Sequence, residues 1–162
     1  MKDLGRHLRV LTTAATVVIP GALSAQGTAC KINDSSPFQV NGAKQYVTLA
    51  ANTRREDEIP KHLSNAIRVL TDNPEKINNE TGRQFMLIRT YAQWLKRTGA
   101  SYEMTRGELG FSTNKDAKQN LLLALDSAVT AIERMLPDCA STVRPYRTQF
   151  SDEIYNKAVS AM

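Results

Sequence analysis

The sequence contains few of the residues on which most catalytic and metal sites depend. It has 2 histidines, 2 cysteines and 1 tryptophan among 162 residues. After residue 25, His62 is the only histidine, and no cysteine pair has the spacing of zinc ligands. There is no Gly-x-Ser-x-Gly turn, and Gly107 and Gly110 do not precede a Lys-Ser or Lys-Thr pair. We therefore expect no catalytic residue, no metal and no cofactor, which favours a protein that is not an enzyme.

The first 25 residues have the layout of a cleavable signal peptide. Basic residues precede an apolar run over residues 10–19, and the small residues Ala22, Ser24 and Ala25 follow. The run is shorter than the roughly 20 residues that cross a bilayer, so a permanent signal anchor is the secondary interpretation. We expect cleavage after Ala25, with Ser24 as the near alternative. The protein is then exported, to the periplasm or outside the cell.

Signal removal also changes the charge of the chain. The full sequence carries a formal net charge of +5, and residues 1–25 hold three basic side chains and one acidic one, so +3 remains. Nucleic-acid binding requires a concentrated basic stripe, which so small a charge does not predict. No later segment is long and apolar enough to span a membrane. We therefore expect neither a nucleic-acid partner nor a membrane span after signal removal.

Apolar residues recur at helical spacing along the rest of the chain, and no stretch alternates as a strand would. This predicts an extended segment over 26–36 and one all-α domain over 37–162, with about five antiparallel helices. The first helix is expected to be capped by Ser36, with Pro37 in its first turn. The residues predicted to face inward are Ala43, Tyr46, Val47 and Ala50 on the first helix and Leu63, Ala66, Ile67 and Leu70 on the second. On the third helix they are Phe85, Ile88, Tyr91, Ala92 and Leu95, and on the fourth Leu121, Leu122, Leu125, Ala128, Val129, Ile132 and Leu136.

Two parts of the helical pattern are less regular. The connection over residues 99–114 is longer than the two to eight residues usual between helices. A flexible surface excursion is the favoured interpretation, and a functional loop is the alternative. The fifth helix is expected to begin near Pro145, with Phe150, Ile154 and Ala158 facing inward. No helix-ending residue follows it, so this is either a natural terminus or the N-terminal part of a longer array.

Two segments resemble the second helix of a tetratricopeptide repeat, in which a small residue sits at a helix contact and a proline soon follows. Ala66 and Pro74 have these places in the first segment, and Ala131 and Pro137 have them in the second. In the third helix, Ile88, Tyr91, Ala92 and Leu95 are similar to the large-large-small-large pattern of the family's first helix. The two alanines lie 65 residues apart instead of 34, so a plain helical bundle is the alternative architecture.

The resemblance implies a scaffold whose first helices line a concave surface for a protein or peptide partner. On the third helix, Arg89, Gln93 and Lys96 form a polar stripe that such a surface would present to an acidic or polar segment. An ordinary solvated helix face is the plainer interpretation of the same stripe.

Cys30 and Cys139 precede the first helix and follow the fourth. If the helices alternate in direction, these two ends lie on the same side of the domain. An exported protein can keep a disulfide, so we predict a Cys30–Cys139 bond, with two free thiols as the alternative.

These observations favour an exported, non-enzymatic helical-repeat scaffold that mediates protein or peptide interactions in the periplasm or cell envelope. One alternative is an exported helical enzyme with an unrecognised site. Another is a small envelope structural module that self-associates through the open face of the fifth helix. The sequence does not identify the partner or the oligomeric state.

Overall fold

The computed structural model describes residues 30–98 and 102–151. Within these ranges it contains five α-helices: α1 (Phe38–Asn52), α2 (Ile59–Thr71), α3 (Glu80–Arg97), α4 (Leu121–Met135) and α5 (Ala140–Thr148). Short 3-10 turns precede α2 (Glu56–Glu58), α3 (Pro74–Lys76) and α5 (Pro137–Cys139). The all-α prediction is confirmed. The predicted cleavage site at Ala25 lies outside the described residues.

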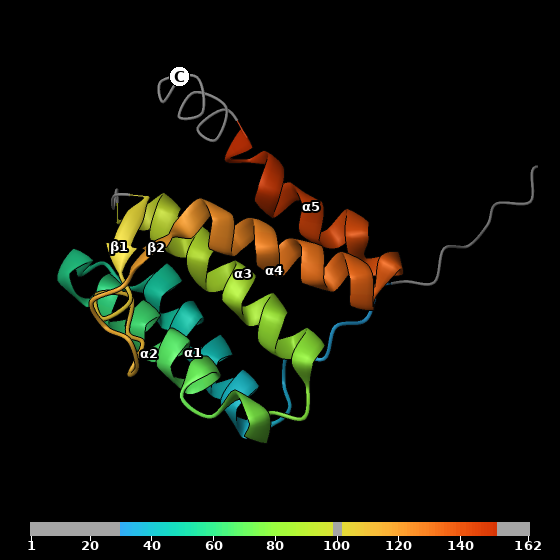
Figure 1. The fold of residues 1–162 in the computed structure, drawn as a ribbon, viewed down its shortest axis with the longest axis horizontal. Coiled ribbons are helices and arrows are strands. Elements are labelled where there is room, and N and C mark those ends of the chain that lie inside the picture. The colour runs from blue at the N-terminus through green and yellow to red at the C-terminus, as the bar shows by residue number, and fades with distance from the viewer. Residues whose placement is uncertain (1–29, 99–101, 152–162) are drawn as a thin grey trace, which may run out of the picture.

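The helices stack in chain order. Each one packs against the next, and the odd-numbered helices α1, α3 and α5 also pack against their odd-numbered neighbours. Figure 1 shows this succession, with α1 and α2 at one edge of the stack and α5 at the opposite edge. The middle helix α3 is consequently covered on two sides.

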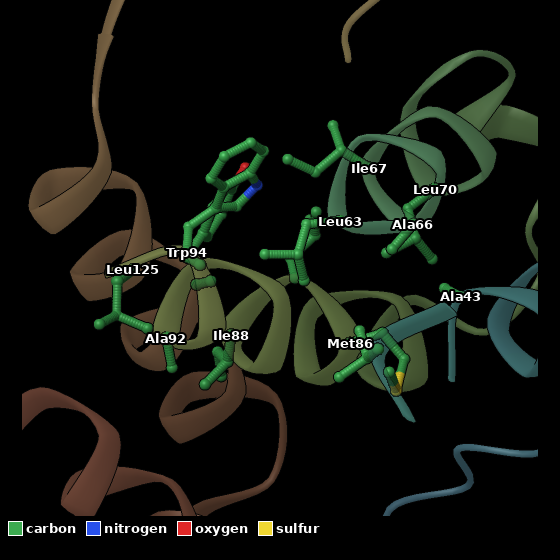
Figure 2. Packing of buried hydrophobic residues seen from close by; sticks show 14 of the residues in the cluster. Ala43, Leu63, Ala66, Ile67, Leu70, Met86, Ile88, Ala92, Trp94 and Leu125 are labelled. Atoms are coloured by element: carbon green, nitrogen blue, oxygen red, sulfur yellow. The ribbon is translucent and has the colours of Figure 1, made fainter. Parts of the chain in front are cut away.

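The apolar stripes read from the sequence form the core. Ala43, Val47 and Ala50 of α1 are completely buried, as are the four stripe residues of α2. In Figure 2, Leu63, Ile67 and Trp94 lie together on the side of α3 that faces α2, whereas Ile88 and Ala92 lie on its other side. Because α3 buries side chains in both directions, it joins the two halves of the stack.

An N-terminal segment over residues 30–37 runs outside the helices and is held at several points. The side chain of Asn79 caps α3 by accepting the backbone N–H of Gly82 at 2.9 Å. Its amide nitrogen donates to the backbone carbonyls of Asn33, at 2.8 Å, and Ser36. One side chain thus begins a helix and fastens the segment that precedes α1.

The expected cap of the first helix was wrong. Pro37 is the N-cap residue of α1, and no side chain caps this end. Ser36 instead directs its carbonyl oxygen to Asn79.

The fifth helix begins earlier than predicted. It starts at Ala140, directly after the 3-10 turn Pro137–Cys139, and Pro145 lies inside it. Pro137, at the start of that turn, has the role that the sequence analysis gave to Pro145. Phe150 is buried, as expected. Ile154 and Ala158 lie outside the described residues.

The connection before α4 contains a hairpin that the sequence analysis missed. Strands β1 (Glu103–Thr105) and β2 (Lys118–Asn120) pair in antiparallel register, with Met104 opposite Gln119. Three-residue strands are too short to show an alternating pattern. The segment between the strands is also not a free surface excursion, because Leu109 is completely buried and Phe111 nearly so.

The hairpin loop is fixed to α2. The hydroxyl of Ser64 donates to the carbonyl of Glu108 at 3.3 Å, and the hydroxyl of Ser112 donates to Asp72 at 2.6 Å. Arg106 lies over the ring of Phe111, 3.8 Å from its centroid. The loop therefore covers the outer side of α2 as an ordered part of the fold.

The predicted disulfide is present. Cys30 and Cys139 are bonded across 109 residues, with their Cα atoms 4.7 Å apart. Cys139 is buried at the joint between α4 and α5. The bond therefore fastens the start of the described chain to the far edge of the stack.

None of the described helices has the length and apolar character needed to cross a membrane.

Removing the disulfide by Cys30→Ala with Cys139→Ala should lower the free energy of unfolding by about 4–5 kcal/mol on the chain-entropy model, because so large a loop is released. Urea unfolding of the oxidised protein and of the variant measures the loss. A reductant should produce a similar loss in the wild-type protein and none in the variant. Equal stability of the oxidised protein and the variant would contradict this prediction.

Replacing Gly110 by alanine should destabilise the protein by about 1–3 kcal/mol. Gly110 has a φ of 96°, and an added Cβ would lie 2.7 Å from the backbone Cα of Ser64. Gly42→Ala is the matched control, because a Cβ on Gly42 meets nothing within 4 Å. It should stabilise α1 by up to about 1 kcal/mol through helix propensity. Thermal unfolding of both variants tests the contrast, which a similar effect at the two positions would refute.

Candidate functional site

A hollow of about 170 Å³ lies between α3 and α5, and it contains the three polar residues singled out in the sequence. Arg89, Gln93 and Lys96 come from successive turns of one side of α3. Tyr146 of α5 and Gln149, which directly follows α5, form the opposite wall. The lining is completed by Ala92.

The cationic groups of the hollow are not neutralised by ion pairs within the described chain. No carboxylate among the described residues lies within 4 Å of Arg89 or Lys96. Asp34 pairs with Lys44 at 2.9 Å and also interacts electrostatically with Arg89. Burial acts to raise the pKa of Asp34, but the hydrogen bond and charge of Lys44, with help from Ser35 and Arg89, lower it overall. Asp34 thus stays ionised near the hollow, with its bond to Lys44.

Gln93 lies between Arg89 and Lys96 on α3. Its side-chain oxygen is buried and has no hydrogen-bond partner in the structure. A buried carbonyl without a partner costs about 1–3 kcal/mol. The hollow itself offers the cations Arg89 and Lys96, whereas the Gln93 oxygen is enclosed by protein atoms.

The wall made by α5 depends on a network around Arg147. Its guanidinium bonds to Asp126 at 2.5 Å, to Glu133 at 3.2 Å and to the hydroxyl of Thr130 at 2.8 Å, all on α4. Arg144 adds a second bond to Glu133 at 2.8 Å. These contacts fix the rotation of α5, and with it the direction in which Tyr146 faces α3.

Tyr146 is also positioned from α3. Its ring meets the ring of Phe85 edge to face, with centroids 6.4 Å apart and an interplanar angle of 88°. Aromatic pairs favour this geometry. Tyr146 thus stands at the edge of the hollow as a partly buried aromatic surface beside the two cations.

One wall of this hollow was predicted from the sequence and the other was not. Tyr146 and Gln149 are three residues apart and follow Pro145, where a helix was expected, but their spacing alone does not show that this side of the helix meets α3. Trp94, the sole tryptophan, is 2% exposed and belongs to the core. Its indole N–H has no acceptor in the structure. His62 lies near the start of α2 and is not part of the hollow lining.

The described residues hold no group of three His, Cys, Asp or Glu side chains that could bind a metal ion. The lining of the hollow likewise includes none of these four residue types. Its side chains supply cationic groups, amides and an aromatic ring.

Comparison with protein-family models, with curated proteins and with solved structures found no match to this chain.

Acid should weaken the attachment of α5, because it depends on ionised carboxylates. The hydrogen bond from Arg144 lowers the pKa of Glu133 below 4.5, and although burial opposes this, Arg147 lowers it further. A carboxyl whose pKa is lower in the folded state stabilises the fold above its unfolded pKa, and this stabilisation is lost as the pH falls through the folded value. The melting temperature should therefore fall below about pH 4.5.

Glu133→Gln tests the assignment of this acid sensitivity. The variant should be less stable than the wild type at pH 7 and should approach it at pH 3, as thermal unfolding by circular dichroism will show. Glu75→Gln is the control, since Glu75 is exposed and has no ion pair among the described residues. A stability difference for Glu133→Gln that does not change with pH would refute the assignment.

Proposed function

We propose that this protein is an exported, non-enzymatic helical-repeat scaffold that binds an acidic segment of a protein or peptide in the hollow between α3 and α5. The observation that carries the proposal is the set Arg89, Gln93 and Lys96, which meets Tyr146 in one hollow. The two cations have no carboxylate within 4 Å among the described residues, and the Gln93 oxygen is unsatisfied.

The packing order of the helices supports a repeat-like architecture. Each helix contacts the next one, and each odd-numbered helix also contacts the next odd-numbered helix. This open stack resembles helical-repeat proteins, in which each repeat contacts only its neighbours. In such a stack the odd-numbered helices share one surface. Arg89 and Tyr146, from α3 and α5, both belong to that surface.

Two observations support export. The first 25 residues have the order of charge, apolar run and small residues of a signal peptide. The Cys30–Cys139 disulfide is of a kind that persists in oxidising compartments and is rare in the cytosol. The periplasm and the cell exterior both satisfy these two requirements.

The groups of the hollow indicate how an acidic segment binds. Carboxylates of the segment pair with Arg89 and Lys96, which lie two turns apart on α3. Tyr146 contributes apolar contact at the edge. The absence of carboxylate, imidazole and thiol groups from the lining favours binding over catalysis.

Binding is tested by measuring fluorescence polarisation of labelled peptides from a random library enriched in Asp and Glu, with the purified protein as receptor. The tightest binder should lose about 10- to 100-fold in affinity on Arg89→Glu with Lys96→Glu, because two attractions become repulsions. Its affinity should also fall as salt is raised.

The control is Lys115→Glu with Lys118→Glu, which changes the net charge equally on the exposed hairpin. It should leave the affinity within about twofold, since these lysines lie outside the hollow. Equal losses of affinity in the two double variants would mean that the net charge of the protein, and not the hollow, determines peptide binding. A library without any binder would also overturn the proposed site.

A further inference from the structure

The outward side of α1 differs from the other helix surfaces in its lack of charge. Among the 15 residues of α1 the only charged one is Lys44, and its ammonium is paired with Asp34 at 2.9 Å. The same helix exposes Phe38 by 86% and Leu49 by 50%, half of the exposed large hydrophobic residues in the described chain. Large exposed apolar groups without surrounding charge are typical of the centre of a protein interface.

These side chains form one continuous stripe. Phe38, Gly42, Gln45 and Leu49 are separated by four, three and four residues, the spacing at which residues of one helix meet a second helix. Shallow hollows of about 230 and 390 Å³ flank the stripe, and Gln45 and Leu49 line both of them. At Gly42 an added Cβ would meet nothing within 4 Å, so this turn leaves the backbone accessible.

The order of the stripe is symmetric for self-packing. Two antiparallel copies of α1 that cross midway between Gly42 and Gln45 place Phe38 of each copy opposite Leu49 of the other. The same operation places each Gly42 opposite a Gln45, so the small glycine faces a long side chain. The exposed ring of Phe38 in one copy thus reaches the hollow beside Leu49 of the other copy.

We propose that the protein forms a two-fold symmetric dimer in which α1 of one copy packs antiparallel against α1 of a second copy. Charge favours a second copy over a charged partner, because the single cation of this helix is already paired with Asp34 and leaves no unpaired charge on α1. The surface lies on α1, whereas the hollow proposed for the acidic segment lies between α3 and α5. The dimer therefore does not rest on the proposed function.

Self-association thus involves a different helix from the fifth, which the sequence analysis considered. A stripe on a single helix buries less surface than a standard stable interface, so the dimer is weak. Its population should rise with concentration over the micromolar to millimolar range.

Sedimentation equilibrium of the purified protein over this range tests the proposal. The wild type should shift from monomer to dimer, and Phe38→Glu with Leu49→Glu should weaken association at least about 10-fold, because four carboxylates then meet at the contact. The matched control is Leu123→Glu with Met135→Glu, which changes the other two exposed large hydrophobics, both on α4. It should associate as the wild type does. A wild type that is monomeric at about 1 mM, or a dimer equally weakened by both double variants, would overturn the proposal.

The register is tested by cross-linking. Two single variants, Phe38→Cys and Leu49→Cys, are mixed under mild oxidation after each is checked by circular dichroism. The mixture should give a disulfide between the two different variants, whereas either variant alone should cross-link much more slowly. In the proposed register, two copies of the same position lie about 16 Å apart along the helix axis, too far for a disulfide. Equally fast cross-linking of one variant with itself would exclude this antiparallel pairing.

Discussion

The rest of the structure depends on the burial of α3 on two sides. It packs against all four other described helices, so it holds the α1–α2 pair in place relative to the α4–α5 pair. Eight of its 18 residues are buried, and the buried hydroxyl of Thr90 donates to the carbonyl of Met86 at 2.7 Å. The polar residues Arg89, Gln93 and Lys96 of the same helix supply one wall of the hollow. α3 therefore contributes residues both to the core and to the candidate site.

The helices could be predicted from the sequence because their apolar residues are periodic and their ends have local signals. Asn79 caps α3, and the predicted stripe of α2 is buried at every position. Local reasoning was wrong at the start of α1, where Pro37 and not Ser36 is the N-cap residue. The chain before this helix is bound by Asn79, which lies 43 residues after Ser36. The hairpin likewise depends on Leu109 reaching the core and on Ser64 of α2, neither of which a local pattern reveals.

The site was predictable on α3 and not on α5. The spacing of Arg89, Gln93 and Lys96 can be read from one helix, whereas Tyr146 reaches the hollow only because Arg147 fixes the rotation of α5 against α4. That network joins residues between 14 and 21 positions apart, which no helical period connects. The disulfide could be predicted for a different reason, since alternating helix directions place both cysteines at the same end of the stack.

The Cys30–Cys139 bond also determines how the protein carries mechanical load. Tension applied between the two ends of the chain enters at Cys30 and passes through the sulfur atoms to Cys139, because this covalent route is far shorter than the 109-residue loop between them. The helices α1 to α4 lie inside that loop and feel none of the pull. Of the described helices, only α5 lies on the loaded path, so stretching would peel one wall from the hollow while the other four helices remain folded.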